Sequence, residues 1–194
     1  TSNTTLDPII LARSTSEGVN GNQTISYISF DGNTTTAKRA IVVNARSNVQ
    51  IHHCSFVNFL DNAVRMTGQT VGYSGEPTTY ATGNRFYSNS IKDCAKDTYS
   101  APHYNATGGL EIAGQSGMLI YDNDIQQPDR GTNANGHGIK FCNHGDNDGT
   151  KIYNNIVKVP DKKGATGATY GYGFAFEIWT LRGGVEIYNN IIQG

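Results

Sequence analysis

A short pattern of apolar and polar positions returns six times along this 194-residue chain. It begins and ends with an apolar residue, and its fourth position is Asn in four of the copies. The spacing between successive copies is about 26 to 35 residues. A recurring unit of this size is typical of a solenoid, in which each repeat buries its apolar face against its neighbours. The copies are Ile25–Phe30, Ile51–Phe56, Phe86–Ile91, Ile120–Ile125, Ile152–Val157 and Ile187–Ile192.

Apolar and polar residues alternate where each copy begins, which predicts a strand with one buried face rather than a helix. A second alternating segment precedes each copy. Each repeat therefore holds two strands, a tight corner, a short third strand and a loop. Equivalent strands would stack in parallel about 4.8 Å apart and form a coil with three faces. The second segments are Ile9–Leu11, Ile41–Val43, Val64–Met66, Leu110–Ile112, Ile139–Phe141 and Phe176–Ile178.

The corner between the second and third strands is expected to carry a column of asparagines. Asn tolerates the left-handed backbone that a sharp corner needs. Its amide also bonds equivalent residues above and below when copies stack. The expected column is Asn89, Asn123, Asn155 and Asn190.

The V-x-I-x-x-N-x-I phrase, which follows a G-I-x-I segment, resembles the right-handed parallel β-helix of pectate-lyase-like proteins. The resemblance extends from about Ile9 to Ile192. It implies an all-β, right-handed solenoid of about six to seven coils, with three parallel sheets and an Asn ladder at one corner. We expect a single domain over residues 1–194. The fold hosts lyases, glycoside hydrolases, epimerases, phage tailspikes and adhesins, so it leaves the activity open.

Composition narrows the range of partners. A formal net charge of −1 provides no basic face for nucleic acid, and no apolar run is long enough to span a membrane. The chain begins with Thr1 and has no apolar signal segment, which indicates a processed product or an excised piece. We expect a secreted or cell-surface protein.

Cys54, Cys94 and Cys142 lack the close spacing of a metal cluster, so three buried thiols are expected, with one disulfide as the alternative.

Candidate chemistry lies on outward positions, because Ile, Val, Leu and Phe occupy the core positions. On the first face, the residue between two apolar ones is charged in four successive repeats, and the sign alternates. Strands in register would place neighbouring members about 5 Å apart. The expected outward column is Ile10, Val42, Arg65, Glu111, Lys140 and Glu177.

The resemblance implies that this face carries a groove for an acidic polysaccharide. A lyase removes the proton α to a uronate carboxyl group and eliminates the 4-linked sugar, which requires a base and a neutralising positive charge. Lys140 or Arg65 is the predicted base or neutraliser, with Glu111 and Glu177 as tuning groups or Ca²⁺ ligands. A glycosidase would use Glu111 and Glu177 as an acid/base pair two rungs apart. The alternative without chemistry is a ladder of cross-strand ion pairs.

Rings near this column favour a sugar site, because a pyranose presents an apolar face. His137 and His144 flank Lys140, and Trp179 follows Glu177 by two positions, so these three residues are predicted to bind substrate. A second outward column is aromatic, and it predicts either a stacking platform for a glycan or simple packing of strand-favouring rings. This column is His52, Tyr87, Tyr121, Tyr153 and Tyr188, of which Tyr121 and Tyr153 are included among the substrate-binding residues.

The turn Asp146-Asn-Asp148-Gly offers oxygen ligands of the kind that Ca²⁺ prefers, although it lacks the distal Glu of an EF-hand. Three long segments, Lys92–Gly108, Gln126–Gly136 and Lys158–Gly173, rise on one side of the coil and would wall a cleft. Ca²⁺ is the one candidate cofactor.

The two ends of the chain lack polar capping repeats, which predicts further sequence or end-to-end self-association. Two functional hypotheses remain open. The first is an extracellular protein that binds or cleaves an acidic, uronate-containing glycan, as a polysaccharide lyase or glycoside hydrolase if it is an enzyme. The second is a non-catalytic module, such as an adhesin, a glycan-binding segment or a filament subunit.

Overall fold

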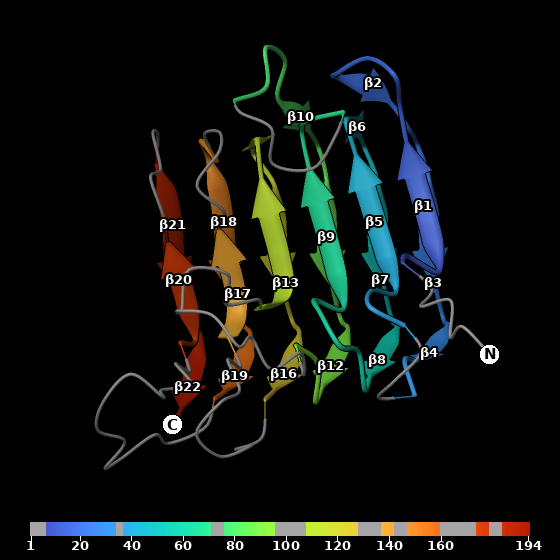
Figure 1. Cartoon of the computed structure of the whole chain (residues 1–194). Coiled ribbons are helices and arrows are strands. Elements are labelled where there is room, and N and C mark those ends of the chain that lie inside the picture. The colour runs from blue at the N-terminus through green and yellow to red at the C-terminus, as the bar shows by residue number, and fades with distance from the viewer. Residues whose placement is uncertain are drawn as a thin grey trace, which may run out of the picture.

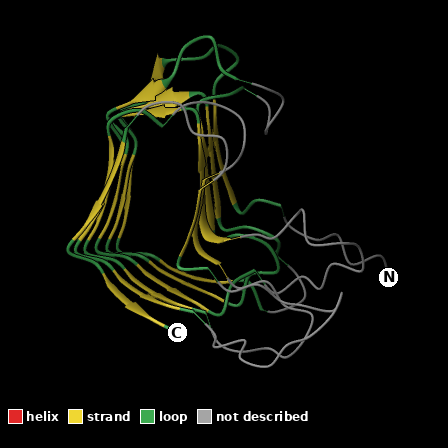
Figure 2. Cartoon of the chain, turned by 90° about the vertical axis from the view of Figure 1, so that its left-hand side faces the viewer, coloured by secondary structure: helices red, strands yellow, loops and turns green. Residues whose placement is uncertain are grey.

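The computed structural model describes residues 7–33, 37–70, 76–95, 108–127, 137–141, 147–159, 174–178 and 184–194. These residues form 22 short strands and no helix. The strands build three six-stranded parallel sheets that run side by side along one axis (Figure 1). Seen along that axis, the chain winds repeatedly through the same three sides, so the described part is a parallel β-solenoid (Figure 2). The all-β, parallel prediction is confirmed.

Each large sheet is named here after its first strand. The β1 sheet contains β1 (Ile10–Arg13), β5 (Ile41–Asn44), β9 (Val64–Thr67), β13 (Gly108–Ala113), β17 (His137–Phe141) and β20 (Phe176–Ile178). The β3 sheet contains β3 (Thr24–Ser26), β7 (Gln50–His52), β11 (Arg85–Tyr87), β15 (Leu119–Tyr121), β18 (Thr150–Tyr153) and β21 (Val185–Tyr188). The β4 sheet contains β4 (Ser29–Asp31), β8 (Ser55–Val57), β12 (Ser90–Lys92), β16 (Asp124–Gln126), β19 (Ile156–Lys158) and β22 (Ile191–Gln193).

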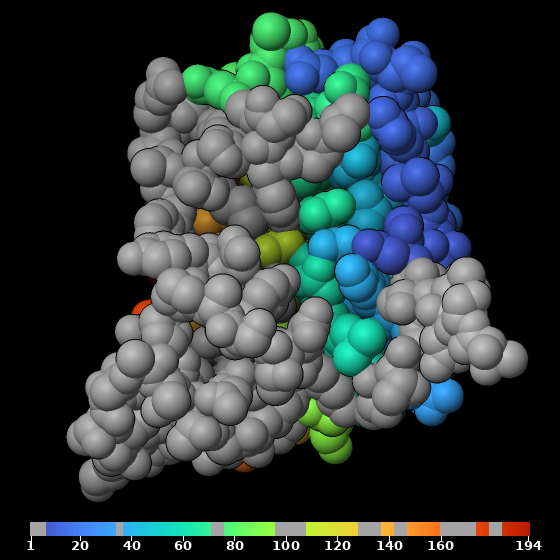
Figure 3. All heavy atoms as spheres, in the orientation of Figure 1, coloured from blue at the N-terminus to red at the C-terminus, as the bar shows by residue number. Residues whose placement is uncertain are grey.

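Two small sheets cross the corner between the β1 and β3 sheets. They pair β2 (Val19–Asn20) with β6 (Arg46–Ser47), and β10 (Ala81–Thr82) with β14 (Gln115–Ser116). In the space-filling view, the first repeats, coloured blue to cyan, lie along one edge of the molecule (Figure 3).

The register of the β3 sheet confirms the repeat, because the first apolar residue of every copy lies beside its equivalent in the next. Interior columns of Ile, Val, Leu and Phe fill the space between the sheets, and most of them are fully buried. Phe30 and Phe56 stack in this interior with ring centroids 5.2 Å apart and nearly parallel planes. The solenoid is therefore held by like residues packing on like residues from rung to rung.

One assignment in the first strand was wrong by one position. Ile10 pairs with the inward residue Ile41, so Leu11, which is 54% exposed, is the first member of the outward column. Ile9, Ile10 and Leu11 are all apolar, and an unbroken apolar run does not show which residues face the core.

The asparagine column forms as expected. The Asn123 side chain accepts a hydrogen bond from the Asn89 backbone N–H (3.0 Å) and donates to Asn155 Oδ1 (2.8 Å). Asn155 in turn donates to Asn190 Oδ1 (2.9 Å). These amides satisfy backbone groups that the corner would otherwise leave buried without partners.

The left-handed backbone at this corner does not lie at the asparagines that form the column. It belongs to the residue before each of them, with φ between 53° and 56° at Ser88, Asp122, Asn154 and Asn189. The expectation that the column asparagines adopt the left-handed turn was therefore wrong, because the turn lies one residue earlier, at Ser88, Asp122, Asn154 and Asn189. The asparagine side chain points inward to form the ladder, so the left-handed turn falls on the outward-facing residue that precedes it.

Two further amide ladders close the other corners. Asn84 donates to Gln115 Oε1 (2.8 Å) and accepts from the Val49 N–H (2.8 Å) between the β1 and β3 sheets. Gln127 accepts from the Cys94 N–H (3.0 Å) and donates to the His137 carbonyl oxygen (3.1 Å) between the β4 and β1 sheets. Neither ladder was predicted from the sequence, because these amides do not recur at a fixed place in the repeated phrase.

Cys54 and Cys94 are buried free thiols, as expected, and burial raises the pKa of Cys54. Cys142 lies outside the described residues. No helix in the described ranges is long and apolar enough to cross a membrane.

Candidate functional site

Four charged residues form one continuous column across the outer face of the β1 sheet. Arg65 pairs in register with Glu111, Glu111 with Lys140, and Lys140 with Glu177. Glu111 and Glu177 are therefore two rungs apart with Lys140 between them. Glu111 and Lys140 are only 4% and 8% exposed. Charges this deeply buried are stable only when neighbouring groups compensate them.

Lys140, Glu177 and His137 form the most compact part of this column. Lys140 Nζ lies 3.2 Å from Glu177 Oε2, and His137 Nε2 lies 3.3 Å from the same oxygen. His137 Nδ1 accepts the Phe174 backbone N–H at 3.1 Å, which places the proton of a neutral ring on Nε2, facing Glu177. Glu177 Oε2 thus lies close to both an ammonium group and an imidazole nitrogen.

Burial lowers the pKa of His137 to about 4, because it outweighs the attraction of the Glu177 carboxylate, while Lys140 lowers the pKa further. His137 is fully buried and its ring stacks on Phe174 with centroids 5.0 Å apart. A neutral, enclosed imidazole therefore lies beside the Glu177 carboxylate.

A second network continues the column toward the N-terminal rungs. Arg39 binds Asp7 at 2.6 Å and also contacts Asp61, whose carboxylate accepts the Asn62 backbone N–H at 2.9 Å. The side-chain amide of Asn62 donates a hydrogen bond to Glu111 Oε2. The charges on this face are therefore linked through hydrogen-bonded neighbours across several rungs.

Burial and ion pairing oppose each other in this network. Burial lowers the pKa of Arg39, but the carboxylates of Asp61 and Asp7 raise it by more. Burial raises the pKa of Asp61, and Arg39 opposes that increase. The pair is consequently stabilised by contact and weakened by desolvation, as is usual for enclosed ion pairs.

Arg39, Asp61 and Asn62 were not predicted from the sequence. Arg39 and Asn62 each lie two residues before the first core residue of their strand, as His137 does, so the repeat spacing contained a signal for them. Gly108 occupies the same place in its own strand, and a Cβ there would lie 3.1 Å from Lys140 Cβ. Glycine therefore leaves room for the Lys140 stem.

The aromatic column stacks continuously along the β3 sheet. Ring centroids are 4.7 Å apart for His52 and Tyr87, 4.8 Å for Tyr87 and Tyr121, and 5.1 Å for Tyr121 and Tyr153, with Tyr188 following at 5.2 Å. Successive planes differ by 16° or less, so the rings cover one another's faces. A ligand on this sheet would meet ring edges and hydroxyl groups. Burial raises the pKa of Tyr121 and Tyr153.

The remaining predicted site residues are placed only in part. Trp179, His144 and Asp146 lie outside the described residues. Asp148 lies in the turn before β18 and accepts the Gly184 N–H at 3.1 Å. Within the described ranges, no three His, Cys, Asp or Glu side chains are grouped to hold a metal ion.

No family model, curated protein or solved structure matches this chain.

Proposed function

We propose that the chain is a right-handed, pectate-lyase-like β-helix that acts outside the cell on an acidic, uronate-containing polysaccharide and cleaves it by β-elimination. The observation that supports this proposal is the Lys140–Glu177–His137 cluster within a column of alternating charge. A rigid parallel sheet presents such groups at a fixed spacing along one line, as a linear polymer requires.

In this proposal Lys140 is the base. Glu177 Oε2, 3.2 Å from Lys140 Nζ, takes a proton from the ammonium group once the substrate excludes water. The free amine then removes the proton α to the uronate carboxyl group, the C4–O4 bond breaks, and the new ammonium returns that proton to the departing O4. Arg65, two rungs away, neutralises the substrate carboxylate.

The residues present fit Ca²⁺ poorly. Lys140 lies between Glu111 and Glu177 in register, with its ammonium group 3.2 Å from Glu177 Oε2, and Glu111 already accepts a hydrogen bond from Asn62. In this proposal, protein side chains carry out the elimination without Ca²⁺. An assay with Ca²⁺ and with EDTA measures whether the activity depends on this ion.

The test is an elimination assay on alginate, pectate and other uronate polymers, with Ca²⁺ and with EDTA, following the ultraviolet absorbance of unsaturated uronate. Lys140→Ala is expected to lower the rate at least about 100-fold, the usual contribution of general acid–base catalysis. The matched control is Lys151→Ala, which breaks an exposed ion pair with Glu186 on the β3 sheet and is expected to leave the rate unchanged. Full activity in Lys140→Ala would refute the assignment.

A non-catalytic module is the second candidate, and the deep burial of Glu111 and Lys140 favours it. The column would then be a stabilising ladder within an adhesin, a glycan-binding segment or a filament subunit. Under this hypothesis no polymer in the panel yields unsaturated product, and Lys140→Ala changes only the free energy of unfolding. Concentration-dependent fibres in electron micrographs would support the filament form.

A further inference from the structure

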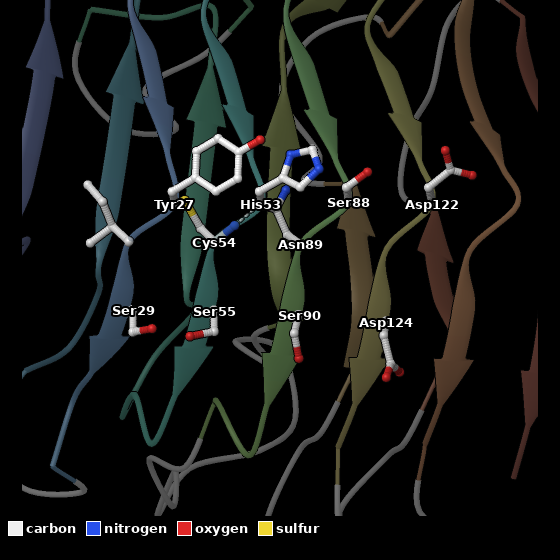
Figure 4. A pocket seen from close by; sticks show the side chains of 11 residues that line it. Tyr27, Ser29, His53, Cys54, Ser55, Ser88, Asn89, Ser90, Asp122 and Asp124 are labelled. Atoms are coloured by element: carbon white, nitrogen blue, oxygen red, sulfur yellow. Dashed lines mark hydrogen bonds between the residues drawn. The ribbon is translucent and has the colours of Figure 1, made fainter.

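A shallow, open groove of about 640 Å³ runs along the corner between the β3 and β4 sheets, away from the charged column. It crosses four successive rungs, and its floor includes Cys54 and Asn89 of the asparagine column (Figure 4). The amide ladder and the buried thiol fix this floor, so the groove is a preformed part of the solenoid.

Tyr27 forms the aromatic end of the groove. It is 76% exposed and stacks on His53 with ring centroids 4.9 Å apart. His53 in turn lies against His52, with the two Nδ1 atoms 2.8 Å apart, which steadies the stack. Unlike the tyrosines of the β3 sheet, Tyr27 leaves most of its ring open to solvent. An open ring at the end of a groove is a surface on which a sugar packs its apolar face.

A row of hydroxyl groups forms one side of the groove. Ser29 pairs in register with Ser55, and Ser55 with Ser90, so one hydroxyl recurs on each rung about 4.8 Å from the next. Figure 4 shows these side chains in line, with Asp124 continuing the row. Hydroxyls and carboxylates at regular intervals are suited to hydrogen-bond a chain of sugar hydroxyls.

The charge of the groove selects against acidic ligands. Asp122 and Asp124 lie together at one end, and no Lys or Arg is among its described lining residues. A uronate polymer would bring its own carboxylates against these two. The charged column of the β1 sheet, by contrast, includes cations.

We infer that this corner groove is a binding site for a neutral, hydroxyl-rich glycan, with Tyr27 as its stacking residue and the serine row and Asp122 as hydrogen-bonding groups. The inference is independent of the proposed elimination, since the groove and the charged column share no residue. If the proposed elimination site also holds, the solenoid has two glycan-binding faces of different chemistry.

The test is isothermal titration calorimetry of the full chain with cellohexaose, xylohexaose and mannohexaose, and with hexaguluronate and hexalysine as charged probes. At least one neutral hexasaccharide is expected to bind. Tyr27→Asn removes the ring but suits the left-handed backbone at this position (φ 58°), so it keeps the fold. We expect this variant to weaken binding about tenfold. Asp122→Asn is expected to relieve the exclusion of hexaguluronate.

The matched control is Tyr188→Asn, which removes an exposed ring of the β3 sheet outside the groove and should change affinity by less than about twofold. Lys140→Ala should bind the neutral sugar with the same affinity as the wild type. The groove can therefore be tested even if the elimination assay shows no activity. The inference is overturned if no neutral hexasaccharide binds, if Tyr27→Asn binds as well as the wild type, or if hexalysine is the preferred ligand.

Discussion

Protonation of the buried imidazole of His137 is expected to destabilise the protein at acidic pH. Its pKa is about 4 in the folded chain, against about 6.5 for an unperturbed histidine. Between these values the unfolded chain binds more protons than the folded chain at this site. The free energy of unfolding therefore rises with pH through this window, and the contribution is lost as pH falls from about 6.5 to about 4.

The size of the effect follows from the separation of the two pKa values. One pKa unit corresponds to about 1.4 kcal/mol, so His137 alone removes about 2 kcal/mol by pH 5 and about 3 kcal/mol by pH 4, relative to pH 7.5. The groups that face the ring are Glu177, which favours the charged imidazole, and Lys140, which opposes it. Burial outweighs both, so the sign is a loss of stability in acid.

The measurement is urea-induced unfolding of the wild type and of His137→Gln at pH 7.5 and pH 5. Gln retains an acceptor for the Phe174 N–H and a donor toward Glu177 but does not titrate. Other ionisable groups contribute equally to both proteins, so the wild type should lose about 2 kcal/mol more than the variant. Equal losses would refute the reasoning, as would an NMR titration of His137 with a midpoint near 6.5.

Two further predictions concern the asparagine corner, and unfolding in urea tests both. Asn123→Ala should lower the free energy of unfolding by about 3 kcal/mol, because the Asn89 N–H loses its acceptor inside the protein; a loss below about 1 kcal/mol would contradict the ladder. Ser88→Gly should raise stability by about 0.5–1 kcal/mol, because φ is 53° there. Its control, Ser90→Gly in strand β12, should have the opposite sign, since glycine weakens a strand.

The strands and their register were largely predictable from the sequence. Apolar residues with a period of two mark the buried face of a strand, and a repeated phrase requires its copies to stack. The prediction of which strand residues face the core was wrong only at Ile9 to Leu11, where no polar residue marks the outward face. The adjacency of Arg65, Glu111, Lys140 and Glu177 followed from the same alternation.

The tertiary structure alone decided what surrounds those positions. Burial of Lys140, and the contacts of His137 and Asn62 with the column, depend on segments outside the repeated phrase. Left-handed geometry at Ser88 rather than Asn89 depends on which side chain faces inward at the corner. The groove beside Tyr27 exists because equivalent residues of separate repeats are brought into line. A linear pattern specifies which face each side chain takes, whereas its neighbours, solvent exposure and pKa arise only when distant segments pack together.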